Sequence, residues 1–311
     1  MNFDSVSRCV RRGLFTLAAS AITAAPPAWP AESGKVAIND GVDDFLLAAM
    51  PPPGIYGIVY LSRYTSDFLA NNAGNAAVDR FSLTANIAVP RFDWIKPVSI
   101  LGADRWGTLI LAPYLDVNAK VAPVPGVNLS DSQRGFGDLT IGNGLHWTLG
   151  DYQMVNAVDI VAPTGSFDAS RLVNLGLNHW AIRLNHMGTW MPQPNWEISY
   201  GLRWDYNFEN PDTHYKTGQI GYAEIATAWL PTPELRLGVI GVAMQQLNAD
   251  SGTGVPPGGN NKFSVNALGA GGNYFFPGGV LFTAKYLKEF DAKNASRGQL
   301  FQISIAFPLG K

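Results

Sequence analysis

Two residues in the middle of the chain have the types and spacing of a catalytic pair. His146 precedes Thr148 by two positions, so a strand would carry both side chains on one face. A histidine beside a hydroxyl can act as the general base for a nucleophile, as in enzymes that cleave lipid esters. Here the hydroxyl belongs to threonine rather than serine, and alternation places both residues on the polar face of the strand. We therefore predict no catalytic residues and keep a lipid-modifying enzyme only as a minor alternative.

Metal and phosphate chemistry find little support in the sequence. The four histidines show no spacing typical of a zinc site, and the chain contains neither CxxC nor HExxH. Gly135 and Gly137 lead into a strand-like segment, and no Lys-Ser or Lys-Thr pair follows them as a phosphate loop requires. We predict no metal site and no cofactor.

Composition narrows the class of protein. Of the 311 residues, 47% are apolar, 12% are aromatic and only 15% are charged, and the formal net charge is −2. A nucleic-acid partner would require a concentrated basic face, and a disordered chain would have less apolar surface. The single cysteine excludes a disulfide scaffold, and no uncharged apolar run of about 18 residues lies beyond the N-terminus. A large soluble β-protein or a membrane barrel built from strands remains.

Apolar and polar residues alternate along much of the chain. In residues 79–89, apolar side chains from Phe81 to Val89 share one face, and polar side chains from Arg80 to Asn86 share the other. Residues 196–207 and 299–307 repeat this pattern. Such a period of two indicates strands, and about 9 to 11 residues suffice for a tilted strand to cross a bilayer. In lipid, the apolar face points outward and the polar face lines the lumen.

Segments of this kind follow one another along the chain with connections of two lengths. The expected strands are 54–64, 79–90, 106–118, 136–149, 152–163, 179–190, 195–207, 217–229, 234–246, 263–275, 280–288 and 298–307. Tight turns at 150–151, 192–194, 231–233 and 277–279 alternate with polar loops at 65–78, 119–135, 164–178, 208–216, 247–262 and 289–297. The connection 91–105 is the exception, because it is long where a turn is expected. We predict an all-β fold: a closed antiparallel transmembrane β-barrel of about 12 strands, with short periplasmic turns and longer external loops.

The alternation also predicts which charged side chains line the lumen. They are Arg80, Asp116, Asp138, Arg183, Glu197, Arg203, Asp205, Glu224, Arg236 and Lys285. This balanced set should pair across the lumen, because an unpaired charge in a narrow space is costly. An ion-selective pore would instead show a ring of one sign. The balance therefore argues against a general ion pore, while a stiffened barrel and a solute path both stay open.

The N-terminus predicts export. Residues 1–31 combine three arginines, a short apolar stretch and small residues with prolines, which is the layout of a secretory signal peptide. Cleavage after Ala25, Ala28 or Ala31 would fit. The expected organisation is a signal peptide at 1–31, an N-terminal segment at 32–52 and the barrel at 53–311.

The N-terminal segment is a candidate plug. Asp40 could cap a short helix that carries Phe45, Leu46 and Met50 and ends at the prolines 51–53. Folded back into the lumen, these three side chains would offer an apolar surface to a hydrophobic solute. The alternative is a tail that lies below the barrel in the periplasm.

Several segments resemble a known family. GFGDLTIGNGLHW (135–147), VAPTGSFD (161–168), NLGLNHW (174–180) and the stretch 210–252 are similar to the family named for the meta-pathway of phenol degradation. The resemblance extends over residues 50–307. It implies an outer-membrane barrel, often associated with the breakdown of aromatic compounds, and brings no catalytic residues. One departure lies at the C-terminus, where Phe307 is not the final residue although the insertion machinery usually reads a terminal aromatic side chain.

Taken together, these features predict a channel for passive uptake of small hydrophobic compounds, aromatic ones among them. We expect it in the outer membrane of a Gram-negative bacterium, with both barrel termini in the periplasm. The expected partners are outer-membrane lipid, the solute and the barrel-insertion machinery, with no nucleic acid. A structural or adhesive barrel that acts through its external loops is the alternative from another class.

Overall fold

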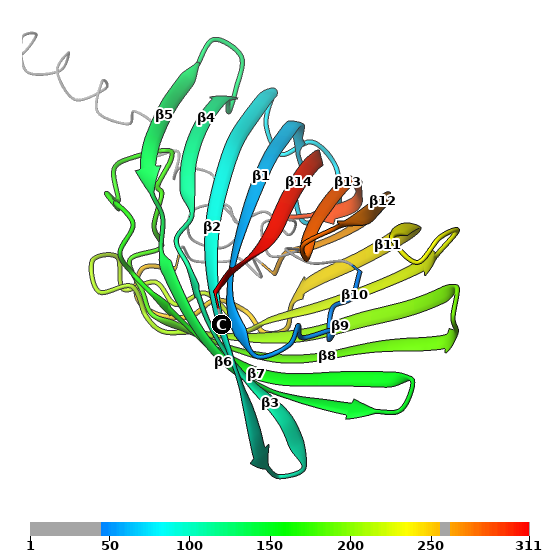
Figure 1. Ribbon diagram of the computed structural model, residues 1–311. Coiled ribbons are helices and arrows are strands. Elements are labelled where there is room, and N and C mark those ends of the chain that lie inside the picture. The colour runs from blue at the N-terminus through cyan, green and yellow to red at the C-terminus, as the bar shows by residue number, and fades with distance from the viewer. Residues whose placement is uncertain (1–44, 256–261, 311) are drawn as a thin grey trace, which may run out of the picture.

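The computed structural model describes residues 45–255 and 262–310, and these residues form one antiparallel sheet (Figure 1). Within this part of the chain, no helix is long and apolar enough to span a membrane. The strands are β1 (Gly54–Leu69), β2 (Arg80–Ile100), β3 (Ala103–Leu111), β4 (Tyr114–Ala122), β5 (Leu129–Phe136), β6 (Leu139–Leu149), β7 (Tyr152–Ala162), β8 (Ala181–Gln193), β9 (Trp196–Asn207), β10 (Ile220–Trp229), β11 (Leu235–Gln246), β12 (Ser264–Phe276), β13 (Val280–Lys293) and β14 (Ser296–Gly310).

The sheet closes into a ring because β1 pairs with both β14 and β2. The fourteen segments occupy twelve positions around the barrel. β3 and β4 follow one another along the same edge of β2 and share one position. β6 and β5 share the next position, because β6 pairs with β3 and β5 pairs with β4. Pro113, which lacks a backbone N–H, lies at the first interruption, and Gly137 and Asp138 lie at the second. The structure therefore confirms the predicted all-β, closed antiparallel barrel of twelve strands.

The two ends of the barrel differ in their connections. At the turn end, tight turns such as Leu101–Gly102 and Gly150–Asp151 join the strands, and Ile55 of β1 pairs with Gly310 of β14. The loop end carries the connections 70–79, 123–128, 163–180, 208–219 and 247–263. Leu101, Gly102 and Gly150 have φ values of 51°, 79° and 66°, which the tight turns require.

Three predicted connections are wrong, each because strands extend farther than alternation indicated. Residues 91–100 belong to β2, so the connection expected at 91–105 shrinks to a tight turn. Most of 119–135 forms the β4–β5 hairpin, and 289–297 is reduced to a turn between β13 and β14. Backbone hydrogen bonding to the neighbouring strands, which the side-chain pattern does not report, continues through these polar residues.

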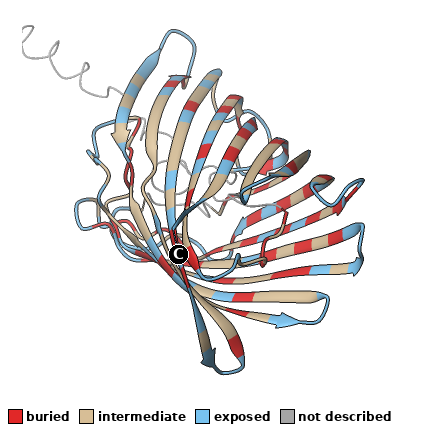
Figure 2. Ribbon diagram, viewed as in Figure 1, coloured by how far each residue is buried: buried red, intermediate tan, exposed pale blue. Residues whose placement is uncertain are grey.

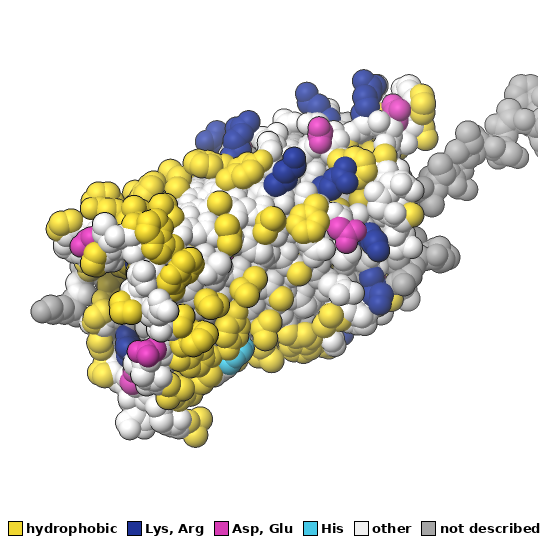
Figure 3. Space-filling view, turned by 90° about the vertical axis from the view of Figure 1, so that its right-hand side faces the viewer, with side chains coloured by type: hydrophobic (Ala, Val, Ile, Leu, Met, Phe, Trp, Pro, Cys, Tyr) yellow, Lys and Arg dark blue, Asp and Glu magenta, His cyan; other side chains and the backbone are white. Residues whose placement is uncertain are grey.

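The inner and outer faces of β9 agree with the alternation. Glu197, Ser199 and Asp205 face inward and are buried, whereas Trp196 and Leu202 are exposed on the outer wall. Buried and more exposed residues alternate in the same way along neighbouring strands (Figure 2). Hydrophobic side chains are spread over the barrel wall in Figure 3, and most Lys and Arg side chains lie toward one end of that face.

The assignment of faces on β2 is wrong and must be inverted. Leu83 and Ile87 pack inside against a buried cluster that includes Tyr64, so Ser82 and Asn86 are on the outer wall. The loop-end halves of β2 and β4 thus have an apolar inner face and a polar outer face. Alternation alone gives two faces but does not say which of them meets lipid, and here the polar face is the outer one.

The connection 163–180 covers the edge of β5, which pairs on one side only, with β4. The Val173 N–H donates to Asp131 Oδ2 at 3.0 Å, and Arg171 Nη1 donates to Gln133 Oε1 at 2.9 Å. An open strand edge is a pairing hazard, and a covering loop is one of its usual protections. In the same connection, hydrogen bonds from the Ser170 hydroxyl and N–H lower the pKa of the Asp168 carboxyl.

Candidate functional site: the barrel lumen

The end of the N-terminal segment lies inside the barrel. The Leu46 N–H donates to Glu197 Oε1 at 2.6 Å, and the Ala48 N–H donates to Thr189 Oγ1 at 3.0 Å. From β3, the Arg105 guanidinium donates to the carbonyl oxygens of Met50 and Pro51. Strands β3, β8 and β9 therefore hold residues 46–51 through their backbone, independently of the side chains that the segment carries.

Glycines on the inner wall provide room for the side chains of this segment. A Cβ atom at Gly238 would lie 2.7 Å from the Phe45 ring, and one at Gly107 would lie 2.8 Å from Met50 Cε. Gly201 faces Leu47 in the same way, with 3.7 Å to Leu47 Cδ1. A larger residue at Gly107 would push against the Met50 side chain of the segment, and one at Gly238 would collide both with Phe45 and with the backbone carbonyl of Thr227 on β10.

The local structure of this segment differs from the predicted short helix. Residues 45–48 form a bend and a turn, closed by the Ala49 N–H, which donates to the Leu46 carbonyl at 2.8 Å. Leu46 adopts a positive φ of 60°, and Phe45 and Leu47 are more deeply buried than Leu46. The predicted capping residue, Asp40, lies outside the described residues.

A buried polar network anchors the segment to the wall. Glu197 is completely buried, and its carboxylate accepts hydrogen bonds from Arg236 Nε at 2.9 Å and from the Ser199 hydroxyl at 2.8 Å. Ser199 in turn lies 2.9 Å from the Thr189 hydroxyl, which also binds the segment. The same carboxylate therefore neutralises a buried arginine and holds the Leu46 N–H.

A second network lies farther along the inner wall toward the loop end. Arg183 binds Asp205 through two hydrogen bonds, from Nε at 2.7 Å and from Nη2 at 2.8 Å. Next to it, Asn185 Nδ2 donates to Asp159 Oδ2 at 2.9 Å. Asp159 was missed by the sequence analysis. Its position on the polar parity of β7, between the outward-facing Val158 and Ile160, is the signal that identifies it.

The inner wall also carries an apolar cluster that the prediction of a purely polar lumen did not include. Its buried members are Phe45, Tyr64, Ala70, Ala85, Ile220, Tyr222, Ala226, Ala228, Ile240, Val242, Met244, Phe263, Val265, Ala267, Leu287, Ala292, Ala295 and Leu300. Phe45 of the N-terminal segment belongs to this cluster. The lumen therefore combines paired charges with a continuous apolar surface.

The predicted lumenal charges fall into three groups. The inner face carries Arg183, Glu197, Arg203, Asp205, Glu224, Arg236 and Lys285. Arg203 Nη2 lies 4.0 Å from Glu224 Oε2, so the opposite charges are paired along the wall. Asp138 lies at the junction of β5 and β6, where it accepts the N–H groups of Gly165 and Leu177 at 2.9 and 2.8 Å.

Arg80 and Asp116 are wrongly assigned to the lumen. The Arg80 side chain is 72% exposed, and Asp116 pairs in register with Asn86 on the outer wall. Both residues belong to the loop-end halves of β2 and β4, where the polar face points outward. The error has the same origin as the inverted faces of β2.

His146 and Thr148 are close together, but they are not arranged as a base and a nucleophile. Thr148 Oγ1 donates to Asp104 Oδ2 at 2.6 Å, and His146 Nδ1 lies 2.6 Å from Asp104 Oδ1. The other ring nitrogen of His146 faces Gln153 Oε1 at 3.1 Å, and the ring is completely buried. Among the described residues, no group of three or more His, Cys, Asp or Glu side chains could hold a metal ion.

Comparison with family models identifies the chain. Residues 66–305 match the family described as "Putative MetA-pathway of phenol degradation". The chain belongs to this family. No curated protein matches its sequence.

Solved structures share the fold of this family member. An outer membrane channel of the COG4313 group from Pseudomonas putida F1 is 17% identical, with a TM-score of 0.74 over 86% of this chain and 99% of that one. The beta domain of the Bordetella autotransporter BrkA is 12% identical, with a TM-score of 0.51 over 82% and 99% of the two chains. The translocator domain of NalP from Neisseria meningitidis is 10% identical, with a TM-score of 0.51 over 88% and 92%. At sequence identities this low, the comparisons show only that the barrel fold is shared.

Proposed function

We propose that this protein is an outer-membrane channel for the passive uptake of small hydrophobic molecules, aromatic compounds among them. The closed antiparallel barrel and the family named for phenol degradation support this reading. The main supporting observation is that residues 45–50 lie within the lumen and pack against glycines 107, 201 and 238. With the segment in this position, the route for a solute would be a narrow passage rather than a wide aqueous pore.

The chemistry of the passage favours an apolar solute. The apolar cluster on the inner wall and the Phe45 side chain offer surface on which an aromatic ring loses its contact with water. Among the described residues, charges of the inner wall pair with the opposite sign, as in Arg183–Asp205 and Arg236–Glu197, whereas selection of ions would call for a ring of one sign. Solutes would enter at the loop end and descend along this apolar wall toward the N-terminal segment.

The location and orientation follow from the same proposal. The apolar outer wall suits lipid, and in outer-membrane barrels the short turns lie in the periplasm. Ile55 and Gly310 are paired at the turn end, so with the turns in the periplasm both barrel termini would lie there as well. β14 continues through Phe307 to Gly310, so the residues beyond Phe307 belong to the strand that the insertion machinery would have to accept.

Liposomes reconstituted with the purified protein test the proposal. We expect small aromatic hydrocarbons to enter faster than in protein-free liposomes, and polar solutes of similar size to enter slowly. Deleting residues 32–50 should raise the rate for the polar solutes, because the paired charges of the wall then meet water directly. Entry of both solute classes at the protein-free rate would reject the channel and favour a structural or adhesive barrel.

A further inference from the structure

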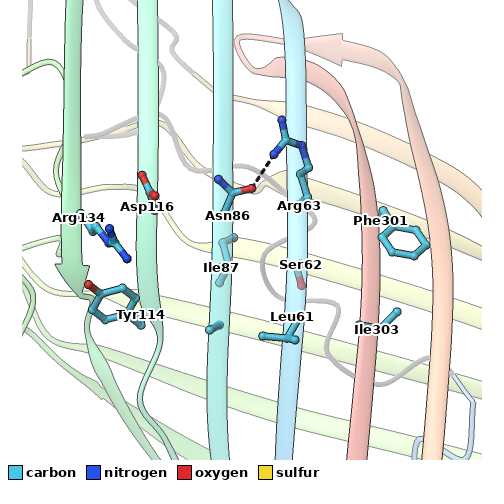
Figure 4. Close-up of a pocket in the computed structure, with 11 residues that line it drawn as sticks. Leu61, Ser62, Arg63, Asn86, Ile87, Tyr114, Asp116, Arg134, Phe301 and Ile303 are labelled. Carbon is cyan, nitrogen blue, oxygen red and sulfur yellow. Dashed lines mark hydrogen bonds between the residues drawn. The ribbon is translucent and has the colours of Figure 1, made fainter.

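A shallow groove of about 390 Å³ lies on the barrel wall where β14, β1, β2, β4 and β5 run side by side (Figure 4). Its lining combines apolar residues with charged ones: Leu61, Ser62, Arg63, Asn86, Ile87, Ala88, Tyr114, Asp116, Arg134, Phe301 and Ile303. Most of these side chains belong to the outer face, because Tyr60 and Tyr64 of the same strand are buried inside. The groove is therefore separate from the lumen.

Two adjacent rows of residues cross the groove and differ sharply in polarity. In the row nearer the turn end, Leu61, Ala88, Tyr114 and Phe136 are paired in register across β1, β2, β4 and β5. Two residues closer to the loop end, the paired row is Arg63, Asn86, Asp116 and Arg134. The next row is also polar, with Thr65, Thr84, Asn118 and Ser132. The outer wall thus changes from apolar to polar within one step along the strands.

A change from apolar to polar residues on the outer wall is expected at the level of the membrane where the acyl chains end and the headgroups begin. Tyr114 and Phe136 pack edge to face with ring centroids 5.2 Å apart, as expected for aromatic residues at a membrane interface. The row from Leu61 to Phe136 forms an apolar floor of the groove. On β14, Ile303 lies beside Leu61 and Phe301 lies beside Arg63, so this apolar floor continues past the arginine. An acyl chain could follow this floor while its headgroup reaches the polar row.

The polar row presents two arginines whose donors are largely available. Arg63 Nη1 donates to Asn86 Oδ1 at 3.0 Å, which occupies one of five guanidinium donors. The Arg134 guanidinium lies 5.8 Å from the centroid of the Tyr114 ring and is exposed. Asp116 stands between them in register, so the row carries two positive charges and one negative charge. Three strand spacings place the two arginine backbones about 14 Å apart.

We propose that this groove binds a bisphosphorylated glycolipid of the surrounding outer leaflet, with one phosphate at Arg63 and the other at Arg134. Arginine is suited to this contact because its planar guanidinium binds phosphate through two parallel hydrogen bonds. The separation of the arginines and the carboxylate between them match two phosphates at opposite ends of a broad headgroup better than a single phosphate. The proposal relies on the outer-membrane location proposed above and is independent of transport through the lumen.

Lipid titration of the purified full chain tests the site. Native mass spectrometry would compare bisphosphorylated lipid A, the same lipid without its phosphates, and inorganic phosphate alone. We expect a clear preference for the bisphosphorylated lipid and no retained inorganic phosphate. Arg63→Gln and Arg134→Gln should each weaken lipid binding about tenfold, the loss expected for one charged hydrogen-bonding partner.

Lys120→Gln is the matched control, because Lys120 is an exposed cation on the same outer face of β4, two rows farther from the apolar floor. It should leave lipid binding unchanged, and a compact band on unboiled gels should show that every variant folds. Equal binding of the phosphorylated and dephosphorylated lipids would overturn the proposal. The proposal would also be overturned if Lys120→Gln weakened lipid binding as much as the arginine substitutions do. Binding of inorganic phosphate as tight as that of the lipid would overturn it as well. Aromatic uptake should be unaltered in all three variants, so failure of the transport proposal would be seen separately.

Discussion

The Leu46 N–H donates to Glu197 Oε1 at 2.6 Å, although the two residues are 151 positions apart in the chain. Glu197 lies on the inner wall of β9 and also neutralises Arg236 of β11. The hydrogen bond therefore ties the N-terminal segment to a deeply buried ion pair of the lumen. A substitution that weakens the hydrogen bonds of this carboxylate should therefore weaken both the attachment of the segment and the ion pair of the wall.

Glu197→Gln should open the passage to polar solutes. The amide keeps the shape of the side chain but loses the charge that binds Arg236 and strengthens the bond to Leu46. Weakening the attachment by about 1.4 kcal/mol would raise the released fraction of the segment about tenfold. Liposome swelling with a small sugar should detect the increase.

Asp205→Asn is the matched control for that substitution. Asp205 also faces inward on β9 and pairs with a partly buried arginine, Arg183. Its loss should lower stability to unfolding in urea, as breaking a buried ion pair does, without releasing the segment. Equal swelling rates for the two variants would contradict the anchoring role of Glu197.

Arginine substitutions should reveal the inverted faces of β2. Leu83→Arg would bury a charge in the apolar inner cluster and should be strongly destabilising, whereas the neighbouring Thr84→Arg, on the outer face, should cost little. On β10, Ile225 is 58% exposed on the apolar outer wall, and Ile225→Arg should cost about 2–4 kcal/mol if it lies at the bilayer midplane. Urea unfolding in lipid vesicles measures all three. If Leu83→Arg were tolerated and Thr84→Arg were strongly destabilising, the faces of β2 would be those predicted from alternation.

Asp138→Ala should free the connection that covers the edge of β5. Its carboxylate accepts two N–H groups from that connection, and Gly165 and Gly176 pack too closely to admit a Cβ atom between them. Each bond to a charged acceptor is worth about 1.5–3 kcal/mol, so its loss should allow local opening. Limited proteolysis should then cleave within 163–180 faster than in the parent protein. Asp131→Ala removes one direct bond to the connection, from the Val173 N–H, instead of two and should have a smaller effect. Equal cleavage in all three proteins would argue against the role of Asp138.

The closed barrel should survive detergent without heating. Unboiled samples should migrate as a compact band that shifts on boiling, because the hydrogen-bonded ring has no free end at which unfolding can begin. Fractionation should recover the protein with outer membranes. Recovery from the soluble periplasm without detergent would contradict the proposed location.

The sequence by itself determined the fold class, the strand number and the faces of strands such as β9. There the apolar set from Trp196 to Tyr206 alternates with Glu197 and Asp205, and the alternation persists over the whole strand. A period of two is a local property of the chain, so it can be recognised without knowledge of any partner strand. The inward position of Arg183, Glu197 and Arg236 followed from the same rule.

Tertiary structure decided which face was the inner one on β2 and β4, and hence that Arg80 and Asp116 lie outside. Alternation is symmetric between inside and outside, and only the height of a strand segment relative to the apolar band breaks that symmetry. The place of Phe45 and Met50 was likewise decided by glycines more than fifty positions away in the chain. Contacts of this kind depend on how the ring of strands closes, and no local period in the sequence records them.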